Sequence, residues 1–207
     1  MSERGLTTDG SVLGLAGRRE TTRTWANLVT AIRTLIAVPL AMAAAVQASP
    51  ELLIAGYLTY WIGDIADGAI ARALDQETRI GAVLDIVADR ACGACCALAL
   101  GVIRPELWPA LAIFLLQFMV LDGALSLSFL RWPVKGPNDF YLIDRIIFRW
   151  NWSKPAKALN TAGVILAAAA DQPVLAVVIA LAQVAVKAYS THRLLQLTPD
   201  PQPDPQP

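Results

Sequence analysis

Long apolar segments alternate with short polar ones along most of this chain. A helix of about 20 apolar residues crosses the ~30 Å hydrocarbon layer of a bilayer. Segments of about this length recur at residues 26–47, 51–72, 82–103, 107–130, 156–171 and 173–192, and the fifth is the shortest. The pattern predicts an all-α integral membrane protein with six transmembrane helices, which form one domain at residues 25–197.

The two ends of the chain differ from this domain in composition. Residues 1–24 contain one short apolar patch, SVLGLAG, flanked by charged residues, and no convincing signal-peptide cleavage site. We expect this segment to be a cytosolic tail or a surface helix. Residues 198–207 alternate proline with polar residues and are predicted to form an extended, disordered tail.

The distribution of charge indicates how the helices are oriented. Lys and Arg together number 17, as do Asp and Glu, so net charge favours no nucleic-acid partner. Cytosolic loops of membrane proteins carry an excess of Lys and Arg. If the N-terminus is cytosolic, the outside loops carry only Arg104, and the inside segments carry Arg18, Arg19, Arg23, Arg72, Arg79, Arg131, Lys135, Arg145, Arg149, Lys154, Lys157 and Arg193. Both termini are therefore predicted to be cytoplasmic.

A few residue types near or inside the predicted helices have an ordinary structural interpretation. Cys92, Cys95 and Cys96 lie in the third segment, and with one histidine in the chain a zinc site is not expected. We expect these cysteines to pack between helices. His192 is expected at the interface, as are Trp25, Trp108 and Trp132 near helix ends.

Four aspartates lie in or beside the second and third apolar segments. Asp64 and Asp67 are three residues apart, and Asp85 and Asp89 are four apart, so each pair shares one face of a helix. The polar linker ALDQETRI, residues 73–80, turns the chain back between the segments. We therefore expect a helical hairpin to bring all four carboxylates together at its cytosolic end.

Such a cluster is costly in a membrane unless it binds something. An acid at the bilayer centre costs ~2.5–3.5 kcal/mol, and four would cost on the order of 10 kcal/mol, comparable to the stability of a domain. Four carboxylates repel one another, which favours a multivalent cation, and oxygen ligands favour Mg²⁺, Mn²⁺ or Ca²⁺. We predict that Asp64, Asp67, Asp85 and Asp89 bind metal.

Small and basic residues accompany the aspartates. Gly68 and Gly81 flank the turn of the hairpin and let a ligand or another helix approach the backbone. Arg72 lies one helical turn after Gly68, and a guanidinium beside a metal site commonly holds phosphate oxygens. Alone, Arg72 would be interpreted as a basic residue that reaches the membrane interface.

These residues match a known pattern. Its eight fixed positions, D-x2-D-G-x2-A-R-x8-G-x3-D-x3-D, are occupied without a gap by Asp64, Asp67, Gly68, Ala71, Arg72, Gly81, Asp85 and Asp89. The stretch resembles the signature of the CDP-alcohol phosphotransferase (CDP-alcohol phosphatidyltransferase) family. WANLVTAIRTLIAVPL is similar to the family's first membrane helix, which often opens P-N-x-x-T-x-x-R. Asn27, Thr30 and Arg33 keep that pattern, and Ala26 replaces the proline.

The resemblance implies a fold, a reaction and roles. It implies six transmembrane helices around a cytosol-facing polar cavity, a location in a bacterial cytoplasmic membrane, and a homodimer. An acceptor hydroxyl would attack the lipid-side phosphate of CDP-diacylglycerol and release CMP. Asp64, Asp67 and Asp85 would hold one or two Mg²⁺ or Mn²⁺ ions, and Asp89 would be the general base and a further metal ligand. The nucleotide and diphosphate would bind at Gly68, Ala71, Arg72 and Gly81, with Asn27 and Thr30 as contributors.

The acceptor is less well defined by the sequence. The connection between the fourth and fifth segments is rich in cations, and four of them are candidate acceptor ligands: Lys135, Arg145, Lys154 and Lys157. Contact with lipid headgroups is the alternative interpretation, and the two are compatible. SKPAKALNT, residues 153–161, resembles a stretch of the glycerophosphate and cardiolipin branch, with its spacing shifted by one. We expect glycerol 3-phosphate as acceptor, then phosphatidylglycerol, then an inositol phosphate.

Two other classes of membrane protein also place acids in helices. A membrane prenyltransferase binds a metal diphosphate, but it would need more helices and more widely separated acidic motifs. A cation transporter uses acids near the midplane as ion sites. The acids here lie toward one face and no inverted repeat is visible, so both classes are disfavoured.

Overall fold

The described part of the chain, residues 21–198, is built from helices and connecting turns. In the computed structural model the long helices are α1 (Trp25–Gln47), α2 (Pro50–Ala73), α3 (Arg79–Ile103), α4 (Trp108–Leu116), α7 (Lys154–Ala169) and α8 (Pro173–Leu195). Short helices α5 (Gly123–Leu127) and α6 (Arg145–Asn151) lie between α4 and α7. Residues 1–20 and 199–207, which include most of the predicted N-terminal segment and the proline-rich tail, lie outside the described residues.

Every one of the six predicted segments is helical, but four of them have the length and hydropathy of a membrane span. These four are Trp25–Gln47, Arg79–Ile103, Pro105–Arg131 and Pro173–Leu195. Helix α2 is long enough, but its acids lower its hydropathy, and α7 has only 16 residues. The prediction of an all-helical chain with several membrane spans is confirmed, and four of the six predicted spans meet both criteria.

The fourth segment is the least regular. It starts with a 3-10 turn at Pro105–Leu107, continues as α4, and widens into a π-helical turn at Gln117–Asp122 before α5. Turns of this kind are rare and frequently occur at functional sites. The π turn rotates the later residues of the segment relative to α4, so periodicity alone does not place Asp122.

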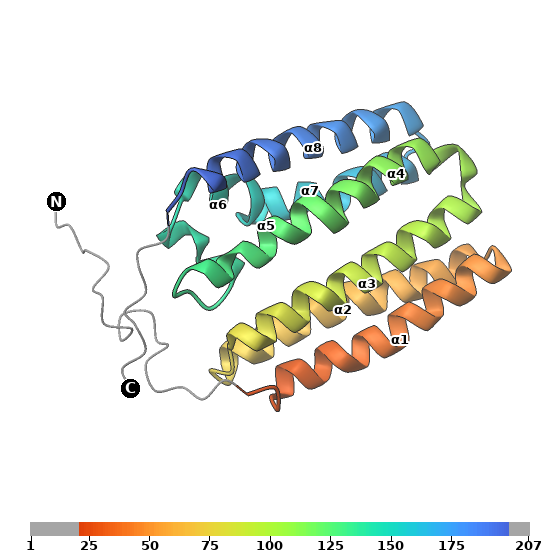
Figure 1. Ribbon diagram of the computed structural model, residues 1–207. Helices are drawn as coiled ribbons and strands as arrows, with labels where there is room; N and C mark the ends of the chain where they lie inside the picture. The colour runs from red at the N-terminus through yellow and green to blue at the C-terminus, as the bar shows by residue number, and fades with distance from the viewer. Residues whose placement is uncertain (1–20, 199–207) are drawn as a thin grey trace, which may run out of the picture.

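The helices form two groups that lie against each other. Figure 1 shows α1, α2 and α3 side by side, and α4, α7 and α8 as a second group, with α3 next to α4. The start of α1, the α2–α3 turn and the end of α8 lie at the same end of the bundle (Figure 1). Hydroxyl side chains begin four of these helices: Thr24, Ser49, Thr78 and Ser153 each accept a hydrogen bond from a backbone N–H in the first turn.

Small residues allow α1 and α2 to pack closely. Ala37, Ala41 and Ala44 on α1 are fully buried. A Cβ on Gly56 of α2 would lie 3.2 Å from the backbone nitrogen of Ala41, so little more than a hydrogen fits there. Cys92 of α3 packs in the same apolar cluster, with Ala37 and Tyr60, as expected for a packing cysteine.

The connection between α5 and α7 folds into an apolar cap. Trp132, Phe140, Ile147 and Trp152 belong to the largest cluster of large buried side chains. Trp132 is only 8 % exposed, so its expected place at the lipid interface is wrong: its ring packs edge-on against Phe140 instead. Trp25, by contrast, is largely exposed.

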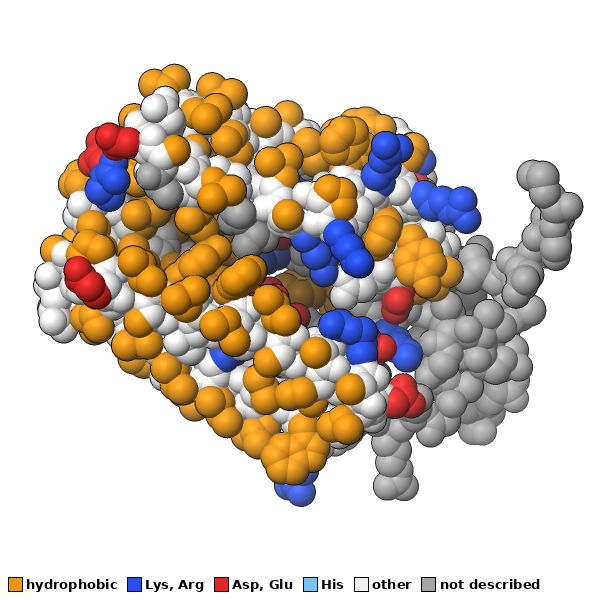
Figure 2. Space-filling model, turned by 180° about the vertical axis from the view of Figure 1, so that it is seen from behind, with side chains coloured by type: hydrophobic (Ala, Val, Ile, Leu, Met, Phe, Trp, Pro, Cys, Tyr) orange, Lys and Arg blue, Asp and Glu red, His pale blue; other side chains and the backbone are white. Residues whose placement is uncertain are grey.

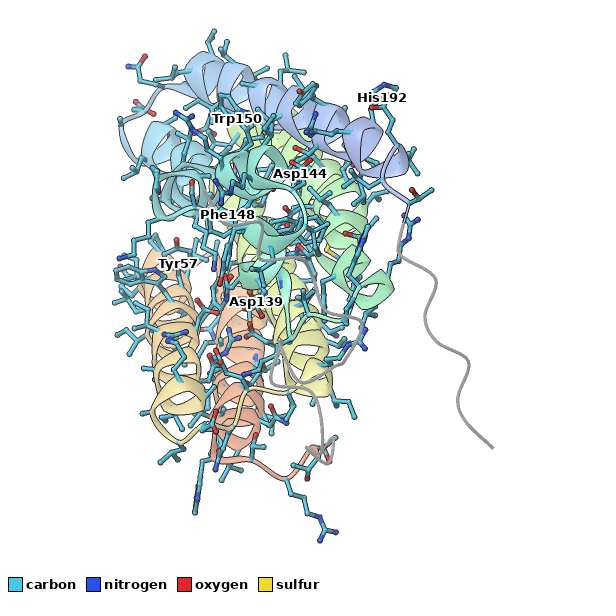
Figure 3. All side chains as sticks on the ribbon, turned by 90° about the vertical axis from the view of Figure 1, so that its left-hand side faces the viewer. Tyr57, Asp139, Asp144, Phe148, Trp150 and His192 are labelled. Carbon is cyan, nitrogen blue, oxygen red and sulfur yellow. The ribbon has the colours of Figure 1, made fainter. Side chains whose placement is uncertain are left out.

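Polar contacts attach this cap to α8. Asp144 begins α6 by accepting from the backbone of Ile146 and Ile147, and its other oxygen pairs with Arg193 of α8 at 2.8 Å. Figure 3, viewed along the helices, shows Asp144 beneath α8 and His192 on the outer side of α8. His192 is exposed, and its position at the membrane interface stays a prediction.

Candidate active site

A cavity of about 950 Å³ lies between the two groups of helices. Its walls come from α1, α2 and α3 on one side and from the fourth segment, α7 and α8 on the other. Figure 2 shows the hollow in one face of the molecule, with acidic side chains inside, basic ones at its rim, and a mainly hydrophobic surface around it. All four aspartates line this cavity, as do Asn27, Thr30, Gly68, Ala71, Arg72 and Gly81.

The α2–α3 hairpin brings the two aspartate pairs together. Asp64, Asp67 and Asp85 each offer one carboxylate oxygen, and these oxygens lie within 4.8 Å of one another. Asp89 is one turn further along α3 and does not belong to this group of three. Asp67 is buried, while the side chains of Asp64 and Asp85 are 40 % and 41 % exposed. Oxygen donors at this spacing fit a hard divalent cation.

Arg33 of α1 lies at the centre of the four carboxylates. Its Nε donates to Asp67 Oδ2 at 2.9 Å, and its Nη2 lies 2.6 Å from Asp85 Oδ1 and 2.9 Å from Asp89 Oδ1. The same nitrogen is 3.6 Å from Asp64. The Arg33 side chain is only 2 % exposed. Each contacted aspartate keeps a second oxygen, so Arg33 neutralises part of the cluster's charge and orients the acids.

Arg33 belongs to the sequence pattern of α1, but that pattern predicted no role for it in the site. A signal was present, because an arginine inside an apolar helix is costly and requires a partner. Its partner acids lie 31 to 56 residues away in sequence, so no local spacing connects them. Gly63 of α2 makes room for this side chain: a Cβ there would lie 2.5 Å from Arg33 Cβ.

Residues of α1 also fix the geometry of the hairpin. The Thr30 hydroxyl lies 2.7 Å from Asp67 Oδ2, so Thr30 orients an aspartate as well as lining the cavity. A Cβ on Gly81 would lie 2.8 Å from Thr78 Oγ1 and 3.0 Å from Asn27 Oδ1. Gly81 is therefore required for the close contact of α1 with α3. At Trp25 the backbone N–H donates to Gln76 Oε1 in the hairpin turn, at 2.9 Å.

Arg72 lies where the i+4 spacing places it. A Cβ on Gly68 would be 3.3 Å from Arg72 Nη1, so the guanidinium covers the backbone of Gly68. The planar group faces the cavity one turn beyond the metal-binding candidates of α2. This position suits a group that holds phosphate oxygens near a bound cation.

The four predicted acceptor ligands separate into two pairs. Lys135 and Lys157 line the cavity, where Lys135 pairs with Glu77 at 3.8 Å and Lys157 donates to Asn138 at 2.7 Å. Arg145 and Lys154 are exposed and are not among the residues that line it.

A second charged cluster, formed by Arg90, Asp122 and Lys187, was not anticipated from the sequence. Arg90 of α3 and Lys187 of α8 both pair with Asp122 of the π turn. All three line the same cavity as the aspartates. Their separations of 32 and 65 residues in sequence leave no spacing signal that would have linked them.

Comparison with known proteins agrees with the signature and the geometry. A family model described as CDP-alcohol phosphatidyltransferase matches residues 23–189, which include both α1 and the four aspartates. No curated protein and no solved structure matches the chain. With most of its length matched to that model, the chain belongs to the CDP-alcohol phosphatidyltransferase family, a family of phosphotransferase enzymes.

Proposed function

We propose that this protein transfers a phosphatidyl group from CDP-diacylglycerol to the hydroxyl of an acceptor, with release of CMP. Glycerol 3-phosphate is the acceptor we favour, and phosphatidylglycerol or an inositol phosphate are the alternatives. The observation that carries the proposal is the placement of Asp64, Asp67 and Asp85, with Asp89 and Arg72, on the wall of one cavity.

The donor set fits the divalent ion that this family uses. Three carboxylate oxygens lie within 4.8 Å of one another. The Arg33 guanidinium among them shows that the cluster attracts positive charge. We propose Asp64, Asp67 and Asp85, with Asp89 as a further ligand, as the residues that hold Mg²⁺ or Mn²⁺. When bound, such an ion neutralises the diphosphate and the charge that develops on the departing CMP.

Protein side chains supply the remaining roles. Asp89 is proposed as the base that takes the proton of the acceptor hydroxyl. Arg33 holds Asp89 Oδ1 at 2.9 Å, so proton transfer would use Oδ2. Arg72 would hold phosphate oxygens, and Gly68, Ala71 and Gly81 would line the nucleotide and diphosphate site.

One wall of the cavity suits a lipid substrate. Leu53, Ile54 and Leu58 of α2 and Val164 and Ile165 of α7 line it with aliphatic side chains. Tyr57 of α2 lies at this edge of the molecule in the end-on view (Figure 3). Acyl chains placed between α2 and α7 would remain in an apolar environment while the diphosphate reaches the aspartates.

We further propose that α2 and α7 complete a set of six spans, with both termini on the cytosolic side of a bacterial membrane. With 24 residues, α2 reaches ~36 Å, enough for the ~30 Å core, and its aspartates face the cavity instead of lipid. The 16 residues of α7 give ~24 Å, which a locally thinner bilayer accommodates. The homodimer is proposed on the family resemblance.

The decisive assay measures CMP release from CDP-diacylglycerol by the purified protein in mixed micelles with Mg²⁺ or Mn²⁺. Glycerol 3-phosphate, phosphatidylglycerol and inositol phosphate are supplied in parallel. We expect acceptor-dependent CMP release that is abolished by a chelator. A prenyltransferase would release diphosphate from a prenyl substrate instead, and a transporter would release neither product. Absence of CMP with every acceptor would refute the proposed activity.

A further inference from the structure

The Arg90–Asp122–Lys187 cluster is deeply buried for three charged groups. The side chains are 13 %, 15 % and 3 % exposed, respectively. Arg90 Nη2 contacts Asp122 Oδ2 and lies 3.3 Å from Ser126 Oγ, and Lys187 Nζ contacts Asp122 Oδ1. The Arg90 guanidinium also lies over the ring of Phe118, 4.1 Å from its centroid.

These residues lie far from the ends of their helices. At 1.5 Å per residue, Arg90 is ~16 Å from Arg79, where α3 begins, and Lys187 is ~12 Å from Leu195, where α8 ends. Asp122 is ~13 Å from Arg131 by the same measure. In a ~30 Å hydrocarbon core these depths approach the midplane, where charged groups are expensive and usually functional.

The charges of the cluster do not balance. The single negative charge of Asp122 is shared by two cations, Arg90 and Lys187. The cluster therefore carries an excess positive charge. Arg90 Nε is buried and has no acceptor among the described residues. Asn160 Nδ2 of α7 also has none, and the Asn160 carbonyl accepts from Gln183, one turn before Lys187. A structural ion pair would not need the second cation, whereas an anion in the cavity would balance it.

The position of Asp89 next to Arg90 indicates what kind of anion the cluster would bind. Asp89, the proposed base, immediately precedes Arg90 on α3, and all the residues of the cluster line the same cavity as Asp89. An anionic group held by Arg90 and Lys187 would therefore place the rest of its molecule beside Asp89. The cavity-lining cations Lys135 and Lys157 have other partners, Glu77 and Asn138.

We propose that Arg90 and Lys187 form an anion subsite that holds the phosphate of the acceptor, so that the acceptor is a phosphorylated alcohol. Asp122 keeps the two cations together while the subsite is empty and is positioned to share them with the phosphate. This assignment rests on the proposed transferase function and adds to it the chemical class of the acceptor. Lys135 and Lys157 would then meet the anion on its way in.

The test uses the full chain in detergent with glycerol 3-phosphate as probe and glycerol as its uncharged control. Thermal unfolding at increasing probe concentration gives an apparent affinity without turnover. Wild type should be stabilised by glycerol 3-phosphate and not by glycerol. Lys187→Met should weaken the apparent affinity at least tenfold, while Lys154→Met, the matched control at an exposed lysine that does not line the cavity, should change it less than threefold.

Asp122→Asn tests the proposal with a variant in which the affinity for the probe should not fall. This variant keeps both cations and removes their competitor, so glycerol 3-phosphate should bind at least as tightly as to wild type. A cluster with a purely structural role would lower the unfolding temperature in both variants and leave probe affinity unchanged. That result, or a loss of affinity in Lys154→Met as large as that in Lys187→Met, would overturn the proposal.

CMP release separates this proposal from the proposed function. With glycerol 3-phosphate, Lys187→Met should raise the acceptor KM at least tenfold and leave the KM for CDP-diacylglycerol within threefold. Equal use of glycerol and glycerol 3-phosphate by wild type would overturn the phosphorylated-acceptor assignment and leave the transferase function intact. Absence of CMP release with any acceptor would instead overturn the function, and with it the acceptor role of the subsite.

Discussion

Arg33→Met tests whether Arg33 holds the aspartate cluster together. The substitution keeps a long apolar stem but removes a guanidinium that lies 2.6 to 3.6 Å from four carboxylates. Removing one partner of a buried ion pair typically costs ~3–5 kcal/mol. Asp64 and Asp85 are 40 % and 41 % exposed, so water screens part of the interaction, and we expect the lower end, ~3 kcal/mol.

This magnitude is measurable as a shift in unfolding temperature. For a chain of 150–250 residues, 1 kcal/mol corresponds to about 2–4 °C. Arg33→Met in chelator should therefore unfold ~6–12 °C below wild type. Mg²⁺ should reduce this difference in unfolding temperature, because ion binding stabilises the folded state by mass action. Without Arg33 the four acids carry more net negative charge, so they should gain more from a divalent ion than the acids of wild type do.

The control is Arg104→Met, at the opposite end of the bundle. Arg104 pairs with Glu106 and Asp171 but is exposed to solvent, and ion pairs of this kind contribute little to stability. Its unfolding temperature should fall by less than ~4 °C and should not respond differently to Mg²⁺. Equal stability of Arg33→Met and wild type in chelator, or a gap that Mg²⁺ leaves unchanged, would refute the role assigned to Arg33.

Three further perturbations examine the base, the orientation and the packing of the site. Asp89→Asn should lower turnover ~10²–10⁴-fold at every Mg²⁺ concentration because an amide cannot accept the proton. Asp85→Asn should instead regain part of its turnover as the Mg²⁺ concentration rises. If a metal titration fully restored the turnover of Asp89→Asn, Asp89 would be a metal ligand only. A cysteine at Leu74, exposed in the hairpin turn, should resist an impermeant thiol reagent in sealed cells and react after permeabilisation, and labelling from outside would reverse the topology. Gly63→Ala should cost ~1–3 kcal/mol in thermal unfolding because its Cβ would lie 2.5 Å from Arg33 Cβ, and unchanged stability would show that α1 and α2 adjust freely.

Arg33 does not contact the aspartates of the cluster equally, and the difference separates buried from accessible acids. Asp67 is nearly buried and receives contacts from both Thr30 and Arg33, whereas Asp64 and Asp85 remain partly open to the cavity. One acid is thus fixed by protein donors, and two are accessible to a metal ion. The cluster therefore combines one buried acid in a fixed position with two acids that face the cavity.

Local information in the sequence determined much of this protein. Helix positions follow from apolar length, because a segment that must satisfy its own backbone in lipid becomes a helix whatever its neighbours. The spacings of Asp64 with Asp67 and of Asp85 with Asp89 fixed a shared helix face, and the polar turn between them fixed the hairpin. Arg72 lies over Gly68 for the same reason, since i and i+4 are neighbours on any helix.

Tertiary structure decided what depends on packing between distant segments. Arg33 meets its acids only because small residues let α1 approach α2, and Trp132 is buried because the cap folds over it. Lys135 and Lys157 face the cavity while Arg145 and Lys154 do not, although all four belong to one basic stretch. The Arg90–Asp122–Lys187 cluster joins three helices across a π turn that shifts the helical register, and periodicity carries no information across such a shift or between helices.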